Sequence, residues 1–155
     1  MKIAFGCDHA GFELKKELIK YTISLNYDYE DYGTYDEDSV DYPDFGVKIA
    51  NGVAHGEFER GVLICGTGIG MSITANKITG IRAALCYNTM TAKLCREHND
   101  ANILVLGAKV VKSEIAKEIL KIFLETEFSN EGRHIRRLNK IKELEQDCKN
   151  PLGGG

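Results

Sequence analysis

Short apolar runs alternate with longer amphipathic segments along most of the chain, and this alternation limits the fold more than any other feature. The apolar runs have strand length and cover Ile3–Cys7, Tyr27–Tyr32, Val62–Cys65, Ala83–Cys86 and Ile103–Leu106. The segments between them have helical length and mixed faces, and cover Phe12–Leu25, Phe45–Ala54, Ile69–Lys77, Thr89–Glu97 and Glu114–Leu124. A repeat of strand and helix predicts an α/β fold.

Some of the predicted strands, such as Gly61–Cys65, are apolar on both faces. Such strands suit a parallel sheet of five strands that is covered by helices on both sides, the doubly wound arrangement. Ligands of these sheets bind beyond the carboxyl ends of the strands, near the point where the strand order reverses. We therefore expect functional residues in the loops that follow Cys7, Tyr32, Cys65, Cys86 and Leu106.

A length of 155 residues with 43% hydrophobic content predicts one domain with a sizeable core. We place this domain at residues 1–150, including a C-terminal helix at about 133–148, and interpret residues 151–155 as a flexible tail. The acidic segment Gly33–Asp44 is predicted to be a long loop over the crevice.

Charge and cysteine content narrow the range of partners. Lysine and arginine number 20 against 23 acidic residues, which favours neither nucleic acid nor an anionic membrane as a partner. No apolar stretch is long enough to span a bilayer, and the first residues lack the pattern of a secretory signal. Five cysteines without CxxC spacing argue against a disulfide framework or a zinc site, so we expect a cytoplasmic protein.

The segment Cys65–Ser72 carries a thiol at a strand end, then a glycine-rich turn, then the start of a helix. Its glycines allow successive backbone N–H groups to point at one spot, where the helix N-terminus adds partial positive charge. The dinucleotide-binding motif GxGxxG is excluded because Met71 stands where its last glycine is required. The P-loop motif is excluded because no Lys-Ser/Thr pair follows. We interpret the turn as a site for another anion.

Cys65 is the strongest candidate for chemistry, because a thiolate beside a helix N-terminus is stabilised and can act as a base or nucleophile. Buried cysteines are more often packing residues, which is our reading of Cys86, Cys95 and Cys148. Cys7 also lies near a strand end, and a core role is favoured for it.

Asp8-His9 and His98-Asn99-Asp100 each place a histidine beside polar residues at the end of a predicted element. A lone histidine is more often structural than catalytic, and the presence of Cys65 raises the case for both. On the C-terminal helix, Arg133 and Arg137 share one face and could grip a phosphate, or form a solvated basic face. The apolar stripe of this helix could pack on a partner subunit or on its own domain.

Seven short motifs, taken in order, resemble the type B ribose-5-phosphate isomerase family, which is grouped with the galactose-6-phosphate isomerase subunits. They are Gly6–Gly11, Asp41–Pro43, Cys65–Gly68, Asn76–Lys77, Gly80–Ala83, His98–Asn102 and Gly132–His134. The resemblance implies a Rossmann-like three-layer sandwich, no metal or organic cofactor, and a homodimer or tetramer with sites built from both subunits. It also implies interconversion of D-ribose 5-phosphate and D-ribulose 5-phosphate in the non-oxidative pentose phosphate pathway.

Catalytic roles of the family fall on four matching residues. By this resemblance, Cys65 abstracts the C2 proton, Thr67 helps to move a proton between O1 and O2, and Asp8 orients the sugar hydroxyls. His98 resembles the residue that opens the furanose ring.

The substrate-binding residues that the resemblance implies are His9, Tyr42, Gly66, Gly68, Gly70, Asn99, Arg133 and Arg137. His9, Arg133 and Arg137 resemble the phosphate binders, and Asn99 contacts the reacting end. Tyr42 lines the pocket, and the amides from Gly66 to Gly70 would stabilise an enediolate. Lys109 stands where relatives often have arginine, so the charge is kept and the bidentate geometry is lost.

Three other functions stay open at this point. An isomerase of a six-carbon sugar phosphate, such as allose or galactose 6-phosphate, would use the same chemistry. A non-catalytic module that binds a phosphorylated metabolite would use the same crevice. A thiol redox protein would need Cys65 to pair with a second cysteine, and the absence of CxxC counts against it.

Overall fold

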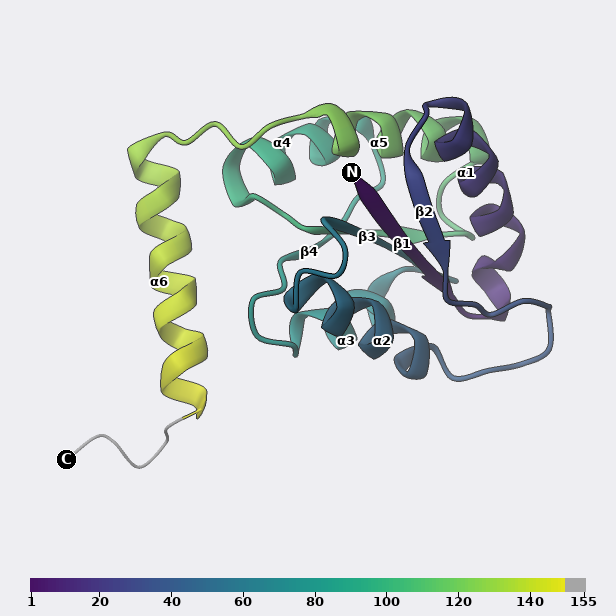
Figure 1. The fold of residues 1–155 in the computed structure, drawn as a ribbon, viewed down its shortest axis with the longest axis horizontal. Helices are drawn as coiled ribbons and strands as arrows, with labels where there is room; N and C mark the ends of the chain where they lie inside the picture. The colour runs from purple at the N-terminus through teal and green to yellow at the C-terminus, as the bar shows by residue number, and fades with distance from the viewer. Residues whose placement is uncertain (150–155) are drawn as a thin grey trace.

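Five strands form one parallel sheet in the computed structural model, which describes residues 1–149 (Figure 1). The strands are β1 (Lys2–Cys7), β2 (Asp28–Asp31), β3 (Arg60–Cys65), β4 (Ala83–Leu85) and β5 (Ile103–Gly107). Their order across the sheet is β2-β1-β3-β5-β4, and every neighbouring pair is parallel. The predicted α/β class with a five-stranded parallel sheet is confirmed.

Helices cover both faces of this sheet (Figure 1). They are α1 (Phe12–Ser24), α2 (Tyr42–Ala54), α3 (Ile69–Asn76), α4 (Thr89–Asn99), α5 (Ser113–Glu125) and α6 (Gly132–Lys149), and a single 3-10 turn, η1 (His9–Gly11), precedes α1. Helices α1, α4 and α5 lie on one face, and α2 and α3 lie on the other. Helix α6 stands apart from these layers, beyond the sheet edge that β4 forms.

Each face of the sheet has its own hydrophobic core, because successive side chains of a strand point to opposite sides. Ile64 of β3 belongs to the core under α1 and α5, together with Phe123. Its neighbour Leu63 belongs to the core under α2 and α3, together with Met71. The continuous apolar runs of the sequence therefore reflect burial on both faces.

Helix α2 begins at Tyr42, three residues before the predicted start at Phe45. Pro43 lies in its first turn, where the fixed backbone angle of proline is already helical and its missing N–H has no role. The predicted loop Gly33–Asp44 therefore ends at Asp41, and Tyr42 is held on a helix. The predicted tail at 151–155 lies outside the described residues.

The strand order reverses between β1 and β3, because the chain leaves β1 toward β2 and returns to the other side of β1 to form β3. Helices α1 and α2 therefore diverge onto opposite faces, and sheets of this kind bind their ligands in the crevice expected beyond the carboxyl ends of these two strands. Cys7 and Cys65 are the residues at those ends. Among the described residues, no helix combines the length and hydropathy that a membrane crossing requires.

Candidate active site

The turn after β3 is built around glycine. Gly68 has a φ of +82°, a left-handed conformation that residues with a side chain rarely adopt, and it precedes the first residue of α3. The Oγ1 of Thr67 accepts a hydrogen bond from the Ile69 amide at 3.3 Å. Cys65 ends β3 and is 4% exposed, so its thiol is largely buried at the end of the strand, directly before the glycine turn.

Two side chains close over this glycine turn. A Cβ placed on Gly70 would lie 2.5 Å from Cζ of Tyr42, so the Tyr42 ring rests directly on the backbone of Gly70. A Cβ on Gly66 would lie 3.6 Å from Cδ and Cε of Lys109, so the lysine stem runs along the other side of the turn. The structure thus brings Tyr42 and Lys109 to the same turn as Cys65 from three different elements.

Asp8 follows β1 and is buried. Its Oδ1 accepts hydrogen bonds from the amides of Ala10 at 3.0 Å and Gly11 at 3.1 Å. These bonds cap the turn η1. The turn packs closely against β3 because residue 11 is glycine: a Cβ there would lie 2.7 Å from the Ile64 carbonyl oxygen. The cap is a structural role that the sequence analysis missed, although an aspartate three residues before a glycine is a signal for such a turn.

His9 is tied to the loop over the crevice. Its Nδ1 accepts a hydrogen bond from the Val40 amide at 3.2 Å. A neutral imidazole whose Nδ1 is an acceptor carries its proton on Nε2, so His9 presents Nε2–H as a donor. Val40 was not among the predicted site residues, since a backbone donor leaves no signal in residue type.

His98 and Asn99 lie at the other end of the strands, where the amino ends of β3 and β5 are. Helix α4 ends there, and the carbonyl oxygen of Asn99 accepts a hydrogen bond at 3.0 Å from Nε of Arg82, just before β4. Cys65 ends β3, five residues after Arg60, the first residue of the strand. The two ends of this strand are therefore about 16 Å apart, and Cys65 lies at the end away from His98 and Asn99. One chain therefore does not bring His98 and Asn99 to Cys65.

The imidazole of His98 stacks on that of His134, with ring centroids 4.2 Å apart and planes inclined by 16°. His134 is 3% exposed, and its Nε2 accepts a hydrogen bond from Nε of Arg133 at 3.3 Å. Burial, and then electrostatic repulsion from His98 and Arg133, lowers the pKa of His134. Arg133 and the exposed Arg137 therefore belong to the same end of the molecule as His98, and His134 joins this set.

The remaining thiols are divided between core and surface. Burial raises the pKa of the Cys7 thiol to about 12, which confirms the core position predicted for it. Cys86 and Cys95 are also buried, with their sulfur atoms 3.9 Å apart. The packing role predicted for Cys148 is wrong, because this residue is exposed on a helix that stands away from the core.

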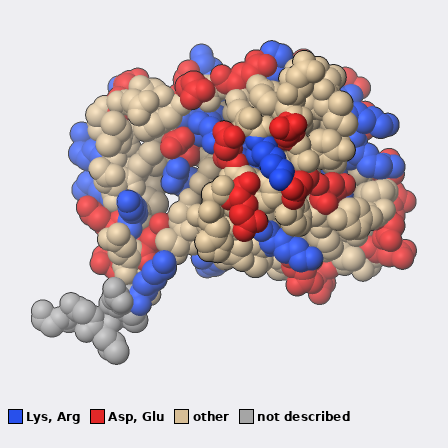
Figure 2. Space-filling model, viewed as in Figure 1, with Lys and Arg blue, Asp and Glu red and all other residues tan. Residues whose placement is uncertain are grey.

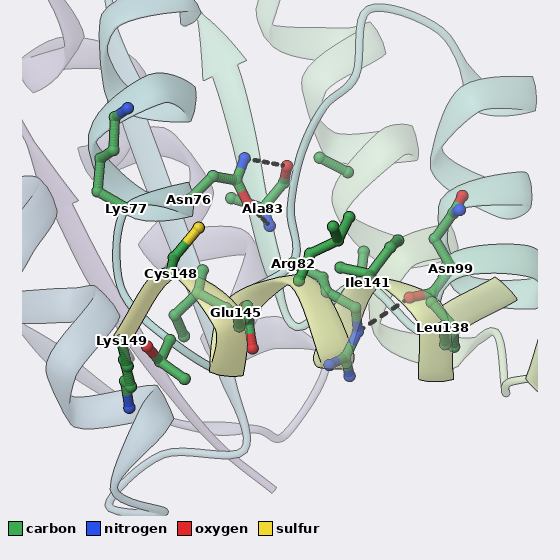
Figure 3. Close-up of a pocket in the computed structure, with 15 residues that line it drawn as sticks. Asn76, Lys77, Arg82, Ala83, Asn99, Leu138, Ile141, Glu145, Cys148 and Lys149 are labelled. Carbon is green, nitrogen blue, oxygen red and sulfur yellow. Dashed lines mark hydrogen bonds between the residues drawn. The ribbon is translucent and has the colours of Figure 1, made fainter. Parts of the chain in front are cut away.

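A groove of about 840 Å³ separates α6 from the body of the protein (Figure 3). Leu138, Ile141 and Leu144 line it from α6, opposite Ile81 and Ala84. Figure 2 shows the hollow beside α6, with acidic and basic side chains interspersed on the surrounding surface. The apolar stripe of α6 therefore faces a groove and is only partly covered by its own chain.

Comparison with known proteins places this geometry in a family context. A family model described as Ribose/Galactose Isomerase matches residues 3–141. Ribose-5-phosphate isomerase B of Escherichia coli is 45% identical, covering 94% of this chain and 97% of that protein. D-erythrulose-4-phosphate isomerase of Pectobacterium atrosepticum is 41% identical, covering 85% and 88%. The solved structure of Clostridium thermocellum ribose-5-phosphate isomerase B has a TM-score of 0.93 and 50% identity, covering 95% of this chain and 99% of that one.

Proposed function

Because the chain belongs to the Ribose/Galactose Isomerase family, we propose that it is an aldose-ketose isomerase that interconverts D-ribose 5-phosphate and D-ribulose 5-phosphate. The observation that carries the proposal is the position of Cys65, a thiol at the carboxyl end of β3 beside a glycine turn and a helix N-terminus. A reducing compartment such as the cytoplasm suits a catalytic thiol. The reaction belongs to the non-oxidative pentose phosphate pathway.

The proposed reaction begins when the thiolate of Cys65 removes the C2 proton of the open-chain aldose. The electron pair left on C2 forms a cis-enediolate, whose negative charge develops on the oxygen at C1. Amides of the glycine turn from Gly66 to Gly70 are fixed donors at the place where this charge appears. Thr67 helps to move the proton between O1 and O2, and return of a proton to C1 completes the ketose.

The phosphate lies at the other end of the substrate in this scheme. His9 presents Nε2–H from the carboxyl edge of the sheet, and Arg133 and Arg137 supply guanidinium groups. Lys109 lies beside the glycine turn, and its ammonium adds positive charge to the crevice. Asp8 orients the sugar hydroxyls with the oxygen that its capping role leaves available.

We further propose that the active unit is a homodimer with shared sites. In one chain, the set around Cys65 and the set around His98 lie at opposite edges of the sheet, too far apart to hold one pentose phosphate. A second copy that packs against α6 and its apolar groove would bring His98, Asn99 and the arginines to the partner's Cys65. Ring opening by His98 would then occur in the site of the other subunit.

Mixing two variants that are defective in different halves of the site tests this sharing. Cys65→Ala inactivates one half of a site, and Arg137→Ala weakens the other half. When subunits exchange at equal concentration, one of four sites keeps both native halves, so we expect activity to recover to about a quarter of the wild-type value. The measurement is isomerase activity at low substrate, with mixed dimers verified by mass.

A matched control mixes Cys65→Ala with Thr67→Ala, because both substitutions lie in the same half. This mixture should show no recovery. Equal behaviour of the two mixtures, with mixed dimers present, would contradict the shared site.

The choice of sugar is tested by comparing kcat/KM for ribose 5-phosphate with kcat/KM for allose 6-phosphate and galactose 6-phosphate. The longer sugars must place one more CHOH group between the glycine turn and the arginines, so we expect the pentose to be preferred by about tenfold or more. A reversed ratio would identify a six-carbon isomerase. Saturable binding without turnover of any sugar would instead identify a binding module.

A further inference from the structure

Lys15 is a fully buried cation in a region that the proposed mechanism does not use. It lies on α1 with 0% of its side chain exposed, and lysine is almost never fully buried unless it is paired. Its Nζ donates hydrogen bonds to Oδ1 of Asp31 at 2.5 Å and to the carbonyl oxygen of Thr34 at 2.6 Å. Both acceptors belong to the end of β2 and the loop that follows it.

These bonds fix the beginning of the loop at residues 32–41. Asp31 Oδ1 also accepts the Gly33 amide at 2.9 Å, so one carboxylate joins the lysine to the loop backbone. The Thr34 amide donates to the Cys7 carbonyl at 2.9 Å, which ties the same loop to the end of β1. Lys15 therefore lies under the point where the loop passes the residue before Asp8 and His9.

The far end of the same loop reaches the site. The Val40 amide donates to Nδ1 of His9, and two residues later α2 begins at Tyr42, whose ring covers the glycine turn. In Figure 1 this loop is the long connection from β2 to α2. Because the buried ammonium of Lys15 holds the beginning of the loop, the loop can keep the Val40 amide within hydrogen-bond distance of the His9 imidazole at its other end.

We propose that Lys15 is a positioning residue for the phosphate end of the site, acting through loop 32–41 on His9. With the loop anchored, the Val40 N–H occupies Nδ1 of His9 and leaves Nε2–H to donate to the substrate phosphate. Without Lys15, the carbonyl of Thr34 loses its buried hydrogen-bond donor. Both this carbonyl and the partly exposed Asp31 carboxylate are then better solvated if they move toward water. This role rests on the proposed function, while the state of the loop can be measured without substrate.

Lys15→Met keeps the length of the side chain and removes the charge. We expect hydrogen exchange of the Val40 amide to become about tenfold faster while amides of β3 and β5 keep their rates. We expect KM for ribose 5-phosphate to rise about fivefold or more with kcat within about twofold, because the hydrogen bonds of Lys15 go to Asp31 and Thr34, whereas Cys65 ends β3 and Thr67 lies in the turn after it.

Lys16→Met is the matched control, since Lys16 is 46% exposed and pairs with Glu13 on the surface of the same helix. It removes the same charge one residue away and should change neither Val40 exchange nor KM. If Lys15→Met fails to fold, Asp31→Asn weakens the same anchor while it keeps an oxygen for the Gly33 amide, and it should give the same pattern at smaller amplitude.

Unchanged Val40 exchange in a folded Lys15→Met or Asp31→Asn protein would overturn the inference. Equal acceleration of all amides would also overturn it, because Lys15 would then serve global stability alone. Suppose that Val40 exchange is faster in Lys15→Met, but the wild-type protein does not turn over ribose 5-phosphate. This result would support the loop anchor and reject the proposed function, so the two failures are distinguishable.

Discussion

Replacing Cys65 by alanine is expected to lower kcat for ribose 5-phosphate isomerisation by about 10²–10⁴-fold, the range for loss of a positioned general base. The loss should fall on kcat and on kcat/KM alike, because the thiol acts on the C2 proton only in the transition state. The fold should survive, since the substitution removes one sulfur atom and leaves the backbone of β3 in place. The assay measures ribulose 5-phosphate formation, with circular dichroism as the check on folding.

Cys7→Ala is the matched control for this experiment. Cys7 ends the neighbouring strand β1, and burial raises the pKa of its thiol to about 12, so Cys7 is protonated near neutral pH and cannot act as the base. We expect this variant to keep wild-type kcat. A Cys65→Ala protein with full activity, or a Cys7→Ala protein without any, would place the base elsewhere.

Gly68→Ala is the second substitution with a large expected effect. A Cβ at this position would lie 2.4 Å from Cδ1 of Leu85 and 3.1 Å from the carbonyl carbon of Leu106, and φ at Gly68 is +82°. The turn must therefore shift, and its amides leave the place where the enediolate charge develops. Misplacing one such donor reduces kcat by about 10²–10³-fold. The strained backbone is expected to lower the free energy of unfolding by about 1–3 kcal/mol.

Gly56→Ala separates strain from catalysis. Gly56 has a similar φ of +78°, at the end of α2, but a Cβ there meets nothing within 4 Å. This variant should lose stability to backbone strain alone and keep its kcat. Denaturant unfolding and initial rates measure the two effects, and equal kcat losses in both variants would show that the glycine turn has no special part in catalysis.

Much of the fold is readable from local pattern. Gly61–Cys65 is apolar at every position, which requires cover on both faces, and the observed sheet supplies it with two separate cores. The glycine turn after Cys65 follows from residue type alone, because the left-handed φ at Gly68 needs a residue without Cβ. The apolar pattern places the start of α2 three residues late, because Pro43, which favours the first turn of a helix, is not part of that pattern.

The roles of individual side chains around the site are harder to predict from the sequence. Asp8 was selected for its chemistry, and the structure shows that one of its oxygens caps a turn. His134 was part of a recognised motif, but its stacking on His98 requires α4 and α6 to meet. Lys15 resembles any helical lysine in the sequence, and only its burial against Asp31 and Thr34 distinguishes it from Lys16.

By itself, the sequence determined the class of fold, the number of strands and the residues able to carry chemistry, because these depend on periodicity and on residue type over short stretches. Only the tertiary structure decided the strand order β2-β1-β3-β5-β4 and the edge of the sheet at which each candidate lies. The physical reason is that a helix reverses the chain: α4 returns from the carboxyl edge, so His98 ends a strand length away from Cys65. Proximity between such residues is set by packing among distant segments, which no local pattern encodes.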